Sequence, residues 1–267
     1  MTPTIVCAIE PGTAERVARA GGELARDLGG RLMLAHVRAD PPLFNSKTER
    51  ERARHRSRRR GREVLRSAHA ALPGGTDADE RVELGVAVSE LTEIAAEIDA
   101  ALMVVGTRGR GRLASALLGS VSQALVQQAP CPVMIVPAKV SADAPRRFDR
   151  TAGEGSTIVV GTDGSAESSP VTRFARELSE HLGDRLVIVP TDAAAEPPAH
   201  ALQAVSAREQ ARLVVIGAGH GEAIRPPLSS SVAAQLPRLA PCPVVVIPEE
   251  GTATVGYAGA PDARRAA

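Results

Sequence analysis

The segment 129–137, APCPVMIVP, returns almost unchanged as APCPVVVIP at 240–248, which is 111 residues later in the chain. The similarity extends upstream at the same separation, because ALMVVG at 101–106 matches RLVVIG at 212–217. A similarity that is kept over this length at a constant spacing indicates that one structural unit is present twice.

Earlier parts of the unit recur as well, at a larger separation. The segment TIVCAIEPG at 4–12 matches TIVVGTDGS at 157–165, which lies 153 residues later. The segment LGGRLMLAHV at 28–37 matches LGDRLVIVPT at 182–191. The sequence therefore predicts two tandem copies of one domain, the second of them shorter.

The unit alternates short apolar runs with segments of helical periodicity, which predicts an α/β fold. Near-continuous apolar strands separated by helices are typical of a parallel sheet that is covered on both faces. We expect each copy to form a doubly wound, Rossmann-like sheet, with the complete strand order 3-2-1-4-5 in the first copy. In the first copy the expected strands are Ile5–Ile9, Leu32–Val37, Arg81–Leu84, Leu102–Val105 and Val133–Val136, and the clearest helices are Lys47–Leu72 and Ser120–Gln128.

The second copy is trimmed, and the missing part can be located. Val37 and Gly106 are 69 positions apart, whereas the matching Thr191 and Gly217 are 26 apart, so 43 residues are absent. This length corresponds to the second helix and the third strand of the first copy, and we expect the second copy to lack both. The predicted organisation is domain 1 at 1–138, a linker at 139–154, domain 2 at 155–249 and a mobile tail at 250–267.

Composition limits the class of protein. Apolar residues make up 43% of the 267 residues and aromatic residues only 1%, so the core must consist of aliphatic side chains. A net charge of +1 provides no overall attraction to nucleic acid or membranes. We see neither a signal peptide nor an apolar run of the ~18 residues that a membrane span needs. Cys7, Cys131 and Cys242 form no C-x-x-C pair, so we expect a reduced, cytoplasmic protein.

A loop rich in glycine, serine and arginine, GTRGRGRLASALLGSV at 106–121, follows the fourth predicted strand. Glycine allows backbone N–H groups to approach an anion closely, and a helix that begins at Ser120 would present further N–H groups to a phosphate. Arginine and serine side chains could add charge and hydroxyl donors. The alternative is a turn that only packs a helix. Neither the P-loop pattern nor the G-x-G-x-x-G dinucleotide pattern is present.

The spacing G-x2-G-x9-G-[ST], formed by Gly106, Gly109, Gly119 and Ser120, resembles the nucleotide-binding signature of the universal stress protein family. The resemblance covers about 1–138 and 155–249. It implies a stress-response protein that binds ATP, with or without Mg²⁺, as a regulatory ligand. The implied site in the first copy comprises an acidic residue that contacts the nucleoside, an adenine neighbour and the glycine segment around ribose and phosphates: Glu10, Val37, Gly106, Arg108, Gly109, Gly119, Ser120, Val121 and Ser122.

Both copies depart from the family pattern. The family usually has Asp where the first copy has Glu10, whose carboxylate is one methylene further from the backbone. The second copy keeps Asp163 but has His220 in place of Gly109 and Ser230 in place of Gly119. Because a Cβ atom hinders close approach of the backbone to a phosphate, we expect one nucleotide per chain, in domain 1.

Other features favour simpler interpretations. The segment ERERARHRSRRRGR at 49–62 contains eight arginines and no aromatic residue, which favours a solvated helix face over a nucleic-acid site. His36 is expected to be packed at the end of a strand. We find no set of residues with zinc-ligand spacing and no G-x-S-x-G nucleophile motif.

Three functional hypotheses remain open: a regulatory ATP-binding protein with at most slow hydrolysis, a scaffold of the same fold that binds no nucleotide, and a nucleotide-processing enzyme. The expected partners are an adenine nucleotide and an unknown protein, without a membrane or a specific nucleic acid. The strands 133–136 and 244–247 are expected to pair within one chain as an intramolecular pseudo-dimer. Further association into a homodimer is left open.

Overall fold

The structure is a computed structural model, and it describes residues 2–42, 46–107, 119–138, 156–162, 169–192, 196–218 and 231–248. Its strands are β1 (Thr4–Ala8), β2 (Arg31–Arg38), β3 (Asp79–Leu84), β4 (Leu102–Gly106), β5 (Val133–Val136), β6 (Thr157–Thr162), β7 (Arg185–Pro190), β8 (Leu213–Gly217) and β9 (Val244–Ile247). Its helices are α1 (Ala14–Asp27), α2 (Lys47–His69), α3 (Ala87–Glu97), α4 (Ser120–Gln128), α5 (Pro170–Leu182), α6 (Pro198–Arg208) and α7 (Val232–Leu239).

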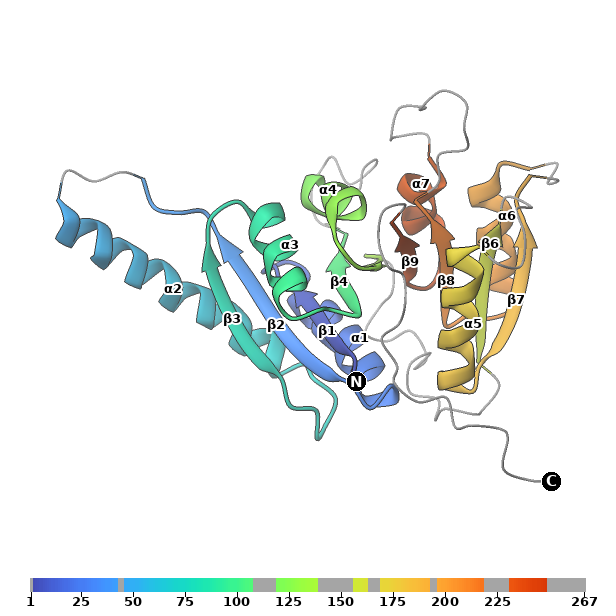
Figure 1. The fold of residues 1–267 in the computed structure, drawn as a ribbon, viewed down its shortest axis with the longest axis horizontal. Helices are drawn as coiled ribbons and strands as arrows, with labels where there is room; N and C mark the ends of the chain where they lie inside the picture. The colour runs from blue at the N-terminus through green and yellow to red at the C-terminus, as the bar shows by residue number, and fades with distance from the viewer. Residues whose placement is uncertain are drawn as a thin grey trace.

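The strands form one nine-stranded sheet in the order β3-β2-β1-β4-β5-β9-β8-β6-β7, with helices on both faces (Figure 1). The first five strands have the predicted order 3-2-1-4-5 and are parallel to one another. In the second half β6, β7, β8 and β9 take the places of strands 1, 2, 4 and 5. The predicted α/β fold with two doubly wound halves is therefore confirmed.

The trimming of the second half is also confirmed. After β7 the chain enters α6, which corresponds to α3, and then β8, which corresponds to β4. No counterpart of α2 or β3 lies between β7 and β8 among the described residues. The predicted linker 139–154 and the predicted tail 250–267 lie outside the described residues. Domain limits within these segments stay predictions.

The halves are joined at the centre of the sheet by β5 and β9, which run antiparallel. Met134 lies opposite Val245, with Val133 opposite Val246 on one side, and all four side chains are fully buried. The expected pairing within one chain is therefore observed. Buried aliphatic residues of both halves form one continuous cluster on each face of the sheet. Since aromatic residues are scarce, these clusters depend on close packing of small side chains.

One such close contact holds α1 against the sheet. Gly21, in the middle of α1, lies over Cys7 of β1, whose thiol donates to the Val17 carbonyl. A Cβ atom at position 21 would overlap the Cys7 Sγ atom. Glycine weakens a helix by roughly 1 kcal/mol relative to alanine, so its presence here reflects the short distance between helix and strand.

We predict that Gly21→Ala lowers the free energy of unfolding by about 2 kcal/mol, although alanine is the better helix former, because overpacking a dense core is costly. Urea unfolding of this variant, of Cys7→Ala and of the double variant provides the measurement. The double variant should recover at least half of the loss, since it removes the overlapping sulfur. Additive effects of the two substitutions would contradict the proposed contact.

A buried ion cluster adds a second connection between the halves. Arg212, just before β8, is 1% exposed and pairs with Asp27 at the end of α1. It also lies 3.5 Å from Asp184, which follows α5. Burial raises the pKa of the Asp184 carboxyl, and the charge of Arg212 opposes that increase. The cluster therefore couples a carboxylate of the first half to a cation of the second.

We predict that Arg212→Met lowers the free energy of unfolding by about 3–5 kcal/mol, because two partly or fully buried carboxylates lose their cation. Arg208→Met, which removes an exposed guanidinium, is the matched control and should change it by less than about 1 kcal/mol. The loss should be larger at pH 8 than at pH 5. Without Arg212 the folded-state pKa of Asp184 rises further, and a raised carboxyl pKa costs stability as the pH increases. A loss that does not depend on pH would contradict this account.

Candidate functional site

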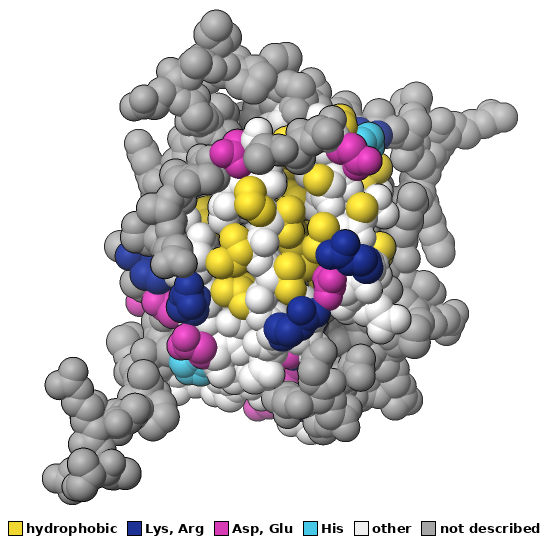
Figure 2. All heavy atoms as spheres, turned by 90° about the vertical axis from the view of Figure 1, so that its right-hand side faces the viewer, with side chains coloured by type: hydrophobic (Ala, Val, Ile, Leu, Met, Phe, Trp, Pro, Cys, Tyr) yellow, Lys and Arg dark blue, Asp and Glu magenta, His cyan; other side chains and the backbone are white. Residues whose placement is uncertain are grey.

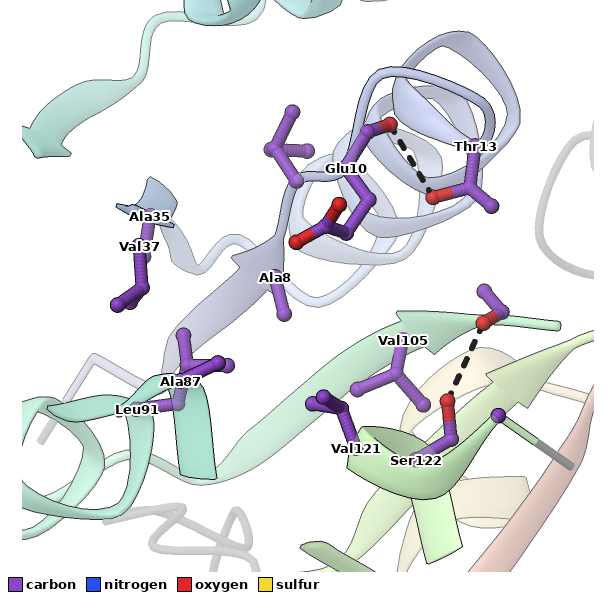
Figure 3. A pocket seen from close by; sticks show the side chains of 13 residues that line it. Ala8, Glu10, Thr13, Ala35, Val37, Ala87, Leu91, Val105, Val121 and Ser122 are labelled. Atoms are coloured by element: carbon purple, nitrogen blue, oxygen red, sulfur yellow. Dashed lines mark hydrogen bonds between the residues drawn. The ribbon is translucent and has the colours of Figure 1, made fainter. Parts of the chain in front are cut away.

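A pocket lies at the carboxyl ends of β1 and β4, where the strand order of the first half reverses. At this position the connections leave the sheet toward opposite faces and open a crevice. Strand ends, the loop after β1 and the first turns of two helices supply its lining (Figure 3): Ala8, Ile9, Glu10, Thr13, Ala35, Val37, Ala87, Leu91, Val105, Gly106, Gly119, Val121 and Ser122.

Most of the pocket wall is apolar. Ala35 and Val37 of β2 lie on one side, and Val105 of β4 lies with Val121 of α4 on the other (Figure 3). Leu91 of α3 completes the apolar wall. Small aliphatic side chains on facing walls suit a flat, weakly polar group such as a nucleobase.

Glu10 places a carboxylate inside this apolar pocket. Its side chain is half-buried and points between the two walls (Figure 3). The position is held by the backbone, because the Glu10 carbonyl accepts from the Thr13 N–H at 2.9 Å and from the Thr13 hydroxyl at 3.4 Å. The carboxylate is thus an acceptor for hydroxyl or amino groups of a bound ligand.

The first turn of α4 supplies donors on the opposite side. The helix begins after Gly119, which has no side chain to cap it. Ser122 in the same turn donates its hydroxyl to the Gly106 carbonyl at 3.2 Å, and this bond fixes the start of α4 to the end of β4. The first N–H groups of a helix have no partner within the helix and attract anions.

The structure brings most of the predicted site residues together. The pocket lining includes Glu10, Val37, Gly106, Gly119, Val121 and Ser122. Ser120 is exposed at the first position of α4 and does not contribute to the lining. Arg108 and Gly109 lie outside the described residues. Of the two predicted hydroxyl donors, Ser122 is already engaged with Gly106.

Gly106 has a second reason to be glycine. A Cβ atom there would lie 2.7 Å from the Thr13 Cβ and 3.0 Å from the Val17 Cγ2. The missing side chain therefore allows α1 to pack against the end of β4. The sequence suggested only close approach to an anion, because the neighbour of this residue comes from a distant part of the chain.

Several residues of the site were missed by sequence analysis. Thr13, Ala87 and Leu91 line the pocket, and Arg16 donates to the Thr107 carbonyl at the start of the glycine segment. A signal existed for Thr13, which directly follows the predicted loop after strand one. No comparable signal marked Ala87 and Leu91, since the position of α3 beside β2 and α4 depends on tertiary packing.

The corresponding helices of the second half cap themselves. In α7 the Ser231 hydroxyl accepts from the Ala234 N–H at 3.2 Å, and in α5 the Ser169 hydroxyl accepts from the Thr172 N–H at 3.2 Å. The matching helices α4 and α1 have no side-chain cap. Asp163, His220 and Ser230 lie outside the described residues. In each of these two helices, one of the N–H groups that an anion would need is thus already bonded to a serine hydroxyl.

Two residues of interest lie away from the pocket. His36 is 3% exposed, and its Nδ1 lies 2.6 Å from the Ile9 carbonyl oxygen, so it is packed as expected. All nine arginines of α2 are exposed, while Ala53, Gly61, Leu65 and Ala68 face the sheet. No group of three metal-binding side chains occurs among the described residues. Within the described parts of the chain, no helix has the length and apolar character to cross a membrane.

The fold and pocket define a doubly wound α/β protein with a crevice at the switch point of its first half. The model of the universal stress protein family matches residues 1–137 and 187–248. The chain therefore belongs to the universal stress protein family, as its glycine spacing suggested.

Two known proteins and one solved structure that are similar to this chain support this assignment. A universal stress protein from Thermus aquaticus is 34% identical over 123 residues, which are 46% of this chain and 89% of that protein. A universal stress protein from Mycobacterium tuberculosis is 32% identical over 133 residues, 48% of this chain but only 43% of its own length. The crystal structure of a universal stress protein from Archaeoglobus fulgidus has a TM-score of 0.63 at 15% identity and covers 92% of this chain and 96% of that one. This last similarity concerns the fold.

The exposed arginines of α2 lead to a prediction about nucleic acid. If they form only a solvated face, duplex DNA should bind weakly at about 50 mM salt and be lost by about 200 mM, as counterion release requires. Fluorescence anisotropy with two unrelated duplexes measures both properties. Binding that persists at the higher salt concentration and distinguishes the two duplexes would overturn the solvated-face interpretation.

Proposed function

We propose that this protein is a regulatory nucleotide-binding member of its family, which holds one ATP, with or without Mg²⁺, in the pocket of the first half. The observation that carries the proposal is the uncapped first turn of α4, which lies across an apolar pocket from the Glu10 carboxylate. In this arrangement the base lies between the β2 and β4 walls and Glu10 accepts from the nucleoside. The phosphates meet the N–H groups that follow Gly119.

The difference between the halves supports a single site. The pocket residues come from the first half, where α1 and α4 lack side-chain caps, whereas Ser169 and Ser231 cap the matching helices of the second half. A phosphate that approached α7 would have to displace the Ser231 hydroxyl. The proposed role is ligand binding with at most slow hydrolysis, and we assign no catalytic residue.

Isothermal calorimetry with ATP and Mg²⁺ tests the site. We predict one nucleotide per chain and loss of binding in Gly119→Val, because a branched side chain would occupy the position where the phosphates approach the helix. Ser230→Val alters the matching position of the second half and should leave affinity unchanged. Two sites per chain, or wild-type binding by Gly119→Val, would contradict the assignment.

Variants of Glu10 test the proposed contact between its carboxylate and the nucleoside. Glu10→Asp restores the residue that the family usually has, and we expect equal or higher affinity for ATP in the same calorimetric titration. Glu10→Ala should lower affinity at least tenfold, since a hydrogen bond to a charged group contributes about 1.5–3 kcal/mol. If Asp163→Ala removed all binding, the nucleotide would belong to the second half. If no variant and no wild-type sample bound ATP, the protein would be a scaffold of this fold, and turnover at ordinary enzyme rates would indicate an enzyme.

A further inference from the structure

The internal repeat makes it possible to compare the same strand with and without its cover. Leu34 of β2 is fully buried in one cluster with Leu65 and Ala68 of α2. Its counterpart in the second half is Ile188 of β7, which is 43% exposed. The difference arises because the described part of the second half contains no counterpart of α2 and β3. A strand position that is core in the first half is therefore surface in the second.

The backbone of β7 has no neighbouring strand on its outer side among the described residues. The N–H of Arg185 donates to Ser156 and that of Thr191 donates to Thr162, both toward the β6 side of β7. Because alternate residues of a strand point their backbone groups in opposite directions, those of Leu186, Ile188 and Pro190 point away from the sheet. We call these three residues the β7 edge. Their side chains share the face that α5 partly covers, since Leu186 packs against the cluster that contains Phe174.

The two outer edges of the sheet differ in their protection. The outer strand of the first half, β3, carries Asp79, Glu80 and Glu83, and such charges discourage strand addition. The β7 edge carries leucine and isoleucine, and its proline, the kind of residue that limits pairing at an edge, stands only at the last position of the strand. Figure 2 shows apolar side chains gathered over this part of the molecule, with charged side chains around them. An apolar, unpaired edge of this kind is a typical site for the addition of another strand.

The surrounding charges select the direction of an added strand. At the start of β7, Arg185 and Arg208 share Glu209, which leaves a net positive charge. At the end of β7, Asp192 and Glu196 are exposed and negative. An antiparallel copy of the same strand would bring the positive end of one against the negative end of the other. A parallel copy would bring like charges together.

We propose that a second copy of this chain docks on the β7 edge, with the two β7 strands antiparallel about a twofold axis at Ile188. The Ile188 N–H groups of the two copies donate to each other's carbonyl oxygens. Each Leu186 N–H donates to the Pro190 carbonyl of the other copy. Proline cannot donate in return, so the ladder consists of these two bonds and the two bonds between the Ile188 residues. The two Ile188 side chains meet on one face and lose their exposure to water. Because the contact uses the same surface twice, assembly stops at a dimer.

Sedimentation velocity over a range of protein concentrations tests the proposal. The wild-type full chain should show a concentration-dependent dimer. Ile188→Arg should raise the dissociation constant at least tenfold, because two guanidinium groups would meet on the axis. Val86→Arg is the matched control, since Val86 is the other large apolar residue exposed in the described part of the chain, at 68%, and lies in the first half. It should leave the dimer unchanged. A monomeric wild type, or a dimer that tolerates Ile188→Arg, would overturn the proposal.

Cross-linking tests the register without adding charge. Ile188→Cys should give a covalent dimer with a short bis-maleimide, whereas Val86→Cys should not. The native Cys7, Cys131 and Cys242 are buried and contribute little background. A monomeric Ile188→Cys that resists labelling would show that other residues of the same chain cover the edge. A monomeric variant that labels readily would show that the edge is free. Either result would contradict the dimer, and neither bears on nucleotide binding in the first half.

Discussion

The antiparallel contact between β5 and β9 is the constraint on which the rest of this structure depends. Through it two parallel sheets become one, and the residues in the contact, such as Met134 and Val245, are fully buried. Each strand is the edge strand that its own half would otherwise expose, so one ladder of backbone hydrogen bonds protects both. The same contact brings Asp27 of the first half within reach of Arg212 of the second. It also leaves β3 and β7 as the two ends of the sheet.

With the central edges joined, the two halves have diverged in complementary ways. The first half keeps a pocket at its switch point and leaves the helices around it without side-chain caps. The second half caps the matching helices with serine, which strengthens the helix starts but uses donors that an anion would need. Its described residues include no counterpart of the layer formed by α2 and β3, and Ile188 is exposed at the edge of the sheet. The proposed binding of a ligand in one half and of a second copy by the other follows from this division.

Some residues of the pocket could be predicted from the sequence, and others could not. Glu10, Gly106 and Gly119 lie next to predicted strand ends or helix starts, and parallel strands bring such positions to one edge of the sheet. Leu91 and Ala87 could not be found in this way, because they belong to a helix whose place against β2 and α4 depends on side-chain packing. Sequence analysis likewise explained the glycine at position 106 only in part, because its closest neighbour, Thr13, is distant in the sequence.

The sequence by itself determined the repeat, the alternation of strands and helices, the absence of one strand and one helix from the second half, and the position of the glycine loop. These properties follow from local hydrophobic periodicity and from spacing, which can be compared between the copies without coordinates. Only the tertiary structure decided that the Ser122 hydroxyl donates to the Gly106 carbonyl and that α4 lacks the side-chain cap that α7 has. It also decided that Arg212 lies buried between two carboxylates. It also showed that Ile188 is exposed where Leu34 is buried. Each of these depends on which distant groups come within a few ångströms, and that is set by the packing of the whole chain.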